Sequence, residues 1–140
     1  LALVDSVIIG CGQRVVKLTT LCYAMRQQES KELKMKLMTK AIIKKLEKRG
    51  HGNEFKDDDE IIVKFFNPMG RGTWYVMEGE KQSNGDWFLF GLADLWEKEW
   101  GYTSLYELQS VKLPLGLGVE RDMHFSGTYK NLKELQNAAS

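Results

Sequence analysis

The sequence predicts an α+β fold, in which a small antiparallel sheet of about four strands packs against helices. Nearly all strand-forming, aromatic and turn-forming residues fall between Ile61 and Phe125. Within this stretch Asn84-Gly85 lies between two β-prone runs, which is the strongest short-range hairpin signal. Apolar residues at helical spacing flank the stretch at 40–49 and 129–138. We therefore expect a three-stranded meander, a C-terminal strand and packed helices.

A chain of 140 residues has room for one domain, and we place it at residues 35–140. Met35 begins a run that is typical of a natural start of translation. Residues 1–34 are interpreted as an N-terminal extension, either upstream sequence or a segment added during cloning; the alternative is an element that docks on the domain or mediates association. Within it, Leu3–Ile9 has the pattern of a strand and Val15–Gln28 that of an amphipathic helix.

The first helix of the domain is predicted at 40–49. Thr39 is a good N-cap, and Gly50 stands where a left-handed residue closes a helix. Strands follow at 60–66, 73–78 and 86–92. The last of these is apolar on both faces, so both faces of the sheet need cover.

The remaining elements have weaker signals. Residues 93–100 are interpreted as a loop or a helical turn. Ser104 and Glu107 form a capping-box pattern, which predicts a helix over 105–111. The segment 119–125 is predicted as the last strand, and a closing helix is predicted at 129–138.

Composition and charge exclude several classes. The hydrophobic fraction of 43% and the charged fraction of 28% are ordinary for a soluble globular protein. Cys11 and Cys22 have neither zinc-ligand nor disulfide-framework spacing, which suits a reducing cytoplasm. Asp5 interrupts the apolar N-terminus, and we expect no membrane anchor. The net charge of +1 combines +7 over residues 1–50 with −6 over residues 51–140.

The sequence lacks the common catalytic signatures. It contains no phosphate-binding Gly-x-x-x-x-Gly-Lys loop, no Gly-x-Ser-x-Gly elbow and no His-Glu-x-x-His zinc motif. The chain has only two histidines and two cysteines, so it lacks the side chains that most nucleophilic and zinc mechanisms require. We therefore assign no catalytic residue, no metal and no cofactor, and we favour a protein that is not an enzyme.

Three groups of residues are candidates for binding. On a strand, Glu120, Asp122 and His124 would share one face, either as a solvated polar row or as ligands for a metal or for acid-base work. Arg121 would face the other way, in a structural ion pair with Glu99 or Glu107 or as an anion site. Aromatic residues form a second group, either in the core or on an exposed surface for a partner or for stacked bases: Trp74, Tyr75, Trp87, Trp96, Trp100 and Tyr102. Of these we select Trp74, Tyr75, Trp100 and Tyr102 as binding candidates. Lysines of the first helix form the third, either as a solvated face or as phosphate contacts: Lys40, Lys44, Lys45 and Lys48.

From about Met35 to Leu135 the chain resembles the domain-of-unknown-function family 2958. The resemblance rests on a series of short motifs in order: Leu37-Met38-Thr39, Val63-Lys64-Phe65-Phe66, Trp74-Tyr75, Phe90-Gly91-Leu92, Glu99-Trp100-Gly101-Tyr102, Ser104-Leu105, Glu107-Leu108, Gly116-Leu117 and Glu120-Arg121-Asp122. The chain departs from the family pattern at Gly118, usually proline, at Glu47-Lys48, usually Leu-Pro, and at His124, often tyrosine. The resemblance implies a short bacterial protein of plasmids, integrative elements or phages.

These observations lead to one expected function and one alternative. We expect a cytoplasmic accessory protein of a mobile element that binds another protein through an aromatic and acidic surface, with anti-defence as one role that this setting implies. The alternative is a nucleic-acid binding or processing protein that uses the basic helix. The partner and the oligomeric state stay open.

Overall fold

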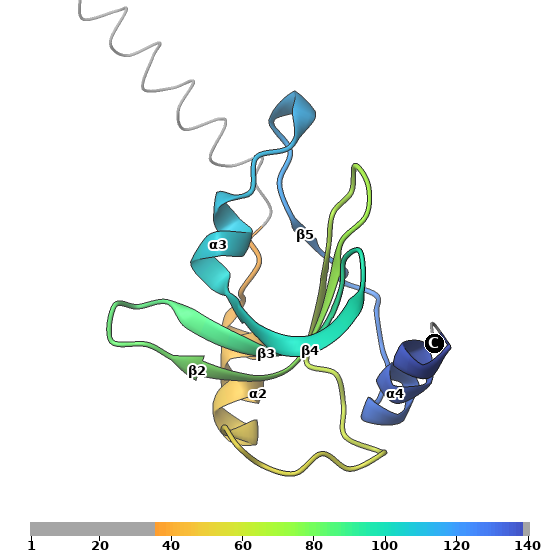
Figure 1. The fold of residues 1–140 in the computed structure, drawn as a ribbon. Coiled ribbons are helices and arrows are strands. Elements are labelled where there is room, and N and C mark those ends of the chain that lie inside the picture. Colours follow the sequence, from red (N-terminus) through yellow and green to blue (C-terminus); the bar gives the residue numbers. More distant parts are fainter. Residues whose placement is uncertain (1–35, 139–140) are drawn as a thin grey trace, which may run out of the picture. The chain divides into compact units, whose positions relative to one another are not determined.

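The computed structural model describes residues 36–138. The strand and helix expected at Leu3–Ile9 and Val15–Gln28 lie outside this range, as do Cys11 and Cys22. The described residues form a five-stranded antiparallel sheet with three α-helices and one short 3-10 turn, which confirms the α+β prediction (Figure 1). Among these helices, none combines the length and the apolar composition that a bilayer crossing requires.

Helix α2 (Lys40–Arg49) has the predicted bounds because both of its ends carry local signals. The Thr39 side chain accepts a hydrogen bond from the Ile42 N–H, and Gly50 closes the helix with φ of 72°. One face of α2 is buried through Ile42 and Leu46. The opposite face carries the lysines.

The sheet has the order β4-β3-β2-β1-β5. Its strands are β1 (Val63–Phe66), β2 (Thr73–Lys81), β3 (Trp87–Asp94), β4 (Lys98–Ser104) and β5 (Glu120–Arg121). The first four are neighbours in sequence and in space, and β5 returns to pair with β1. The expected meander is therefore present, with one more strand than the three predicted for it.

The extra strand corrects the prediction for residues 93–100. This segment is neither a loop nor a helical turn: β3 continues to Asp94, a turn covers Leu95–Glu97, and β4 begins at Lys98. Trp100, Tyr102 and Thr103 are β-prone and stand at alternating or adjacent positions there. The charged residues between them obscured this pattern.

The hairpin between β2 and β3 differs in detail from the prediction. Gln82 pairs with Asp86 around a three-residue loop, through the Gln82 N–H to the Asp86 carbonyl at 2.8 Å. In this loop Gly85 has positive φ, 87°, and Asn84 does not, whereas a two-residue Asn-Gly turn would need positive φ at both positions. This is a type I turn followed by a left-handed glycine, the usual form of a three-residue hairpin loop. A bulge at Val76/Glu78 also interrupts β2.

Both faces of the sheet are covered, as the sequence requires. On one face α2 packs with β1, β2 and β3 around Leu46, Phe65 and Leu89. On the other, helix α4 (Tyr129–Asn137) inserts Leu132 beside Met77 and Leu92. Figure 1 shows α2 and α4 on different sides of the sheet. Burying a leucine such as Leu132 contributes roughly 1.5–3 kcal/mol.

The remaining elements connect these layers. Helix α3 (Leu105–Ser110) follows β4 directly, and the Ser104 hydroxyl accepts from the Glu107 N–H as predicted. A 3-10 turn, η1 (Pro114–Gly116), leads to β5. The predicted last strand over 119–125 is wrong in length, because only Glu120 and Arg121 pair with β1. Thr128 and Asn131 form a capping box that starts α4.

Candidate functional site

Two turns at one end of the sheet meet, and they carry three exposed apolar side chains and one arginine. The turn between β1 and β2 carries Met69 and Arg71, and the turn between β3 and β4 carries Leu95 and Trp96. A Cβ added at Gly72 would lie 3.6 Å from the Leu95 side chain, so the two turns are in contact. We call these four residues, Met69, Arg71, Leu95 and Trp96, the tip patch.

The apolar side chains of the tip patch are unusually exposed to solvent. Trp96 is 86% exposed, Met69 48% and Leu95 41%. The Arg71 guanidinium lies 5.8 Å from the centre of the Trp96 ring and 3.9 Å from Asp94 Oδ1, so it is held between a π face and a carboxylate. Exposed tryptophan beside arginine is the composition typical of interface hot spots.

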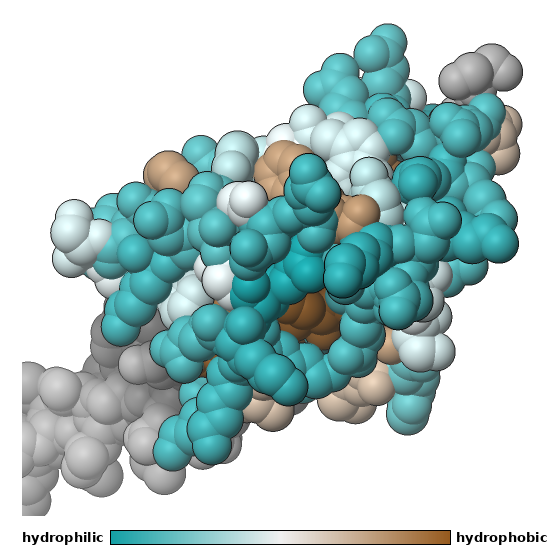
Figure 2. All heavy atoms as spheres, turned by 90° about the horizontal axis from the view of Figure 1, so that it is seen from below, coloured by the Kyte–Doolittle hydropathy of each residue, from teal (hydrophilic) through white to brown (hydrophobic). Residues whose placement is uncertain are grey.

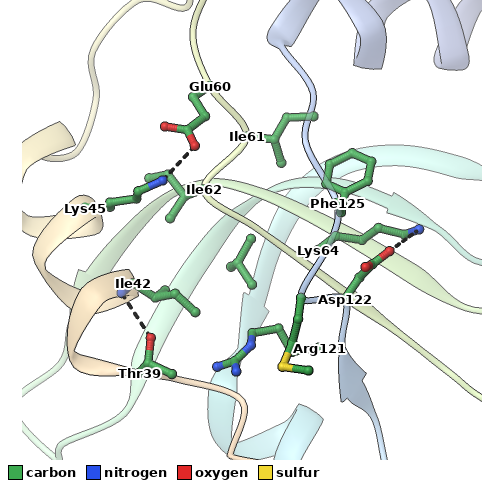
Figure 3. A pocket seen from close by; sticks show the side chains of 12 residues that line it. Thr39, Ile42, Lys45, Glu60, Ile61, Ile62, Lys64, Arg121, Asp122 and Phe125 are labelled. Carbon is green, nitrogen blue, oxygen red and sulfur yellow. Dashed lines mark hydrogen bonds and ion pairs between the residues drawn. The ribbon is translucent and has the colours of Figure 1, made fainter.

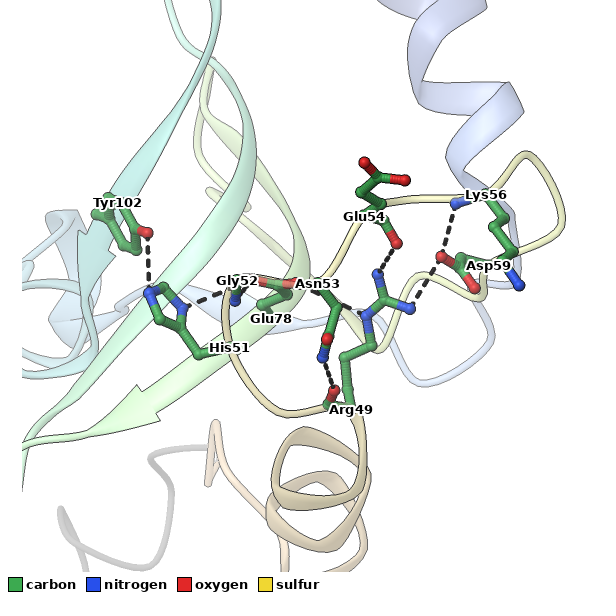
Figure 4. A network of polar contacts seen from close by, with 9 residues as sticks. All are labelled: Arg49, His51, Gly52, Asn53, Glu54, Lys56, Asp59, Glu78 and Tyr102. Carbon is green, nitrogen blue, oxygen red and sulfur yellow. Dashed lines mark hydrogen bonds and ion pairs between the residues drawn. The ribbon is translucent and has the colours of Figure 1, made fainter.

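A second polar cluster lies where the loop after α2 meets β2 and β4 (Figure 4). Glu78 is 3% exposed, at the bulge of β2. Its Oε2 accepts from the Gly52 N–H at 3.1 Å and lies 3.5 Å from His51 Nδ1. His51 Nε2 in turn lies 3.3 Å from the Tyr102 hydroxyl. The result is a hydroxyl–imidazole–carboxylate chain from the surface into the interior.

This chain has the order of groups found in nucleophile–base–orienter arrangements. Its buried end, however, also serves the fold. Arg49 Nε lies 3.7 Å from Glu78 Oε1, and its guanidinium binds Asp59 at 2.9 Å and the Glu54 carbonyl at 2.9 Å. The cluster therefore fastens the loop to the sheet.

The C-terminal candidates do not form the expected row on one strand. The Asp122 carboxylate accepts from the His124 N–H at 3.0 Å and from Lys64 Nζ at 3.2 Å, so the chain turns at the end of β5. These interactions, first the His124 N–H and then Lys64, hold the pKa of Asp122 below its usual range against the effect of burial. Arg121 points elsewhere, and donates to the carbonyls of Lys36 and Leu37.

A groove of about 300 Å³ runs between α2, the start of β1 and the residues after β5 (Figure 3). Ile42 and Ile62 are among its apolar lining residues. Two ion pairs line it: Lys45 with Glu60 at 2.6 Å, and Lys64 with Asp122 at 3.2 Å. The groove therefore has a mixed lining, in which apolar side chains alternate with mutually paired charges and with Arg121.

The lysines of the nucleic-acid alternative lie on the solvent side of α2. Lys40, Lys44, Lys45 and Lys48 are all exposed. Lys45 is in the ion pair with Glu60, and Arg49 at the end of the helix is engaged by Asp59. Figure 2 shows the molecule from below, relative to Figure 1. This face is mostly hydrophilic and contains a hollow with a hydrophobic floor.

The structure separates the aromatic candidates. Trp74 packs against the core on the α2 face, whereas Tyr75 and Trp100 pack on the α4 face. Burial raises the pKa of the Tyr75 hydroxyl. The Trp100 indole N–H donates to the Gln136 side chain of α4. Tyr102, 58% exposed, is the candidate aromatic that is most available at the surface.

The tip patch as a whole was missed, although Trp96 was one of the aromatic residues considered for an exposed surface. Trp96 belongs to a segment taken as a loop or helical turn, and its approach to Arg71 follows only when β4 is placed beside β3. Recognising the β-prone pattern of 99–103 would have located the turn and its exposed tryptophan. Within residues 36–138 no three histidine, cysteine or acidic side chains come together as a metal site.

A family model described as protein of unknown function (DUF2958) matches residues 37–140. The chain belongs to this family. The match covers the sheet and its helices, and it confirms the resemblance carried by the short motifs. Neither a search of curated proteins nor a search of solved structures finds a match to this DUF2958 protein.

Proposed function

We propose that this DUF2958 protein is a non-enzymatic protein-binding module, which uses the tip patch to contact another protein. The observation that carries the proposal is the exposure of Trp96. Burial of a tryptophan side chain by a partner contributes a large share of binding free energy, because it removes a large apolar area from water. In the cytoplasm of a bacterium that carries a mobile element, such a module would act as an accessory protein, with anti-defence as one such role.

The chemistry of the other clusters favours binding over catalysis. The buried carboxylates Glu78 and Asp86 are engaged by backbone N–H groups of their own fold. The acid–base pairs that line the groove neutralise each other. The tip patch contributes little to the core, so its composition is explained more simply by an external contact.

Replacement of Trp96 by alanine is expected to abolish capture of the partner without affecting the fold. An 86% exposed side chain contributes little to stability, so the unfolding free energy should change by less than about 0.5 kcal/mol. The measurement is affinity capture from a bacterial host lysate, followed by mass spectrometry and by denaturant unfolding of the same preparations.

Leu115→Ala is the matched control, because Leu115 is similarly exposed, at 90% against 86% for Trp96, but lies in η1. A specific protein should be recovered with the unmodified chain and with Leu115→Ala, and lost with Trp96→Ala. Recovery of no specific protein, or equal recovery with both variants, would contradict the proposal.

Nucleic-acid binding is the alternative, and its support is the exposed lysine face of α2. Because acidic residues neutralise part of this face, we expect no salt-dependent retention of the protein on short duplex DNA. The comparison is a DNA-binding titration at low and high salt with the unmodified chain and with Lys44→Glu/Lys48→Glu. Retention that falls with salt and disappears in the double variant would replace the protein-binding proposal.

A further inference from the structure

The two edge strands of the sheet differ in length and regularity. β5 contains only Glu120 and Arg121, and the chain turns away after Asp122, whose N–H still donates to the Lys64 carbonyl at 3.0 Å. β4 contains seven residues and pairs with β3 without a register shift. Within residues 36–138, no strand pairs with the other edge of β4. One edge is therefore short and the other is long and regular.

The hydrogen bonding of β3 determines which backbone groups of β4 point outward. The bond from the Gln82 N–H to the Asp86 carbonyl directs Asp86, and every second residue after it, toward β2. The residues between them face β4, where their partners are Glu99, Gly101 and Thr103. The N–H and C=O groups that point away from the sheet belong to the alternate residues, Lys98, Trp100 and Tyr102.

Natural sheets protect such edges with short strands, prolines, bulges, lysines or covering elements. In β4 there is no proline and no bulge. Its lysine, Lys98, donates to the Leu135 carbonyl of α4 at 3.0 Å, and so is held on one face of the sheet. β5, in contrast, is protected by its shortness. The difference indicates that the β4 edge is kept open for a strand from outside.

The charges around β4 indicate the kind of strand. From Asp94 to Glu107 the chain carries four carboxylates and one ammonium group. Glu97, Glu99 and Glu107 are exposed. An approaching acidic segment would be repelled, whereas lysine or arginine side chains would find partners along the edge.

We propose that β4 binds an extended basic peptide segment, which adds to the sheet as a further strand through the outward backbone groups of Lys98, Trp100 and Tyr102. This inference rests on the proposed function and names the part of the partner that the module recognises. Trp96 lies two residues before β4, so one partner can use both the edge and the tip patch.

The test uses a synthetic peptide of about eight residues that alternates lysine with valine, a length chosen to match β4. Binding is measured by calorimetry, and amide hydrogen exchange is followed by NMR. In the free protein the amides of Trp100 and Tyr102 should exchange quickly, and those of Gly101 and Thr103 slowly. The lysine peptide should slow exchange at Trp100 and Tyr102 at least tenfold, and a glutamate–valine peptide should not.

A pair of variants separates backbone recognition from side-chain contact. Tyr102→Pro removes an N–H that points outward and leaves the bonds to β3 in place, whereas Tyr102→Val removes the same side chain but retains the N–H. We expect the proline variant to bind the lysine peptide at least tenfold more weakly than the valine variant. Equal affinity of the two variants, or absence of binding to the unmodified chain, would overturn the inference.

The outcome is distinct from that of the Trp96 experiment. If a captured protein depends on Trp96 but binds Tyr102→Pro and Tyr102→Val equally, the protein-binding function holds and strand addition at β4 does not. If the peptide results are as expected and no Trp96-dependent partner is captured, β4 binds basic strands and the tip-patch proposal fails.

Discussion

Replacement of Gly91 by alanine is expected to destabilise the fold severely. A Cβ at this position would lie 1.7 Å from the carbonyl oxygen of Tyr75 and 2.8 Å from its carbonyl carbon. Both atoms belong to the backbone of β2, so relief requires β2 and β3 to separate where the sheet is held together. We expect a loss of about 3 kcal/mol or more, a large part of the 5–15 kcal/mol that stabilises a typical domain.

Gly101→Ala is the control, since Gly101 is the residue directly paired with Gly91 on β4. A Cβ at Gly101 would meet no atom within 4 Å. Alanine there should leave stability unchanged or raise it by about 0.5–1 kcal/mol, because it reduces the freedom of the unfolded chain. Urea unfolding of both variants gives the comparison. Similar midpoints for the two would show that the close contact at Gly91 does not destabilise the alanine variant.

Asp86→Ala is expected to have the second largest effect. The Asp86 carboxylate is 4% exposed and accepts hydrogen bonds from the N–H groups of Trp87 at 2.7 Å and Tyr106 at 3.0 Å, and from the Ser104 hydroxyl. It thus joins the start of β3 to the start of α3. Removing it leaves buried donors without a partner, and we expect a loss of about 3 kcal/mol in denaturant unfolding.

The same carboxylate makes this loss depend on pH. Burial opposes its ionisation, but the hydrogen bonds from Ser104, Tyr106, Trp87 and Leu105 outweigh burial and hold the pKa of Asp86 below its usual range. The ionised group therefore stabilises the fold fully above the pKa of the unfolded chain, about 3.9. This contribution is lost as the pH falls through the lower pKa of the folded state.

The stability difference between the unmodified chain and Asp86→Ala should accordingly be largest near pH 7 and shrink as the pH falls below about 4. Unfolding curves for the two proteins at a series of pH values provide the measurement. Asp86→Asn, which keeps the shape but not the charge, is the control for the ionised state. A difference that stays constant down to low pH would contradict the role of the charge.

The elements that could be predicted from the sequence are those specified by neighbouring residues. Thr39 and Gly50 fix the two ends of α2, and Gly85 marks the hairpin between β2 and β3. The need to cover both faces of β3 follows from its alternation alone. Each of these signals acts within a few residues of the feature that it specifies.

The elements that escaped prediction depend on distant partners. β4 is a strand because β3 lies beside it, although its own sequence mixes charged and aromatic residues. Arg121 donates to the carbonyls of Lys36 and Leu37, which lie on a segment remote in sequence. The tip patch requires two turns to meet, and neither turn alone indicates this. Local patterns specify elements, whereas a surface site is assembled by their packing.

The order of the strands also determines how the chain reaches its fold. Among themselves, β1 to β4 pair as sequence neighbours through short connections, so loop closure costs these pairings little entropy. β5 must instead find β1 across the whole meander. During synthesis the four-stranded part can form before Glu120 has been added, and β5 and α4 then close the structure last. Until then the apolar surface around Met77 and Leu92 remains uncovered. The growing chain is therefore most prone to aggregation, and gains most from chaperones, at this stage.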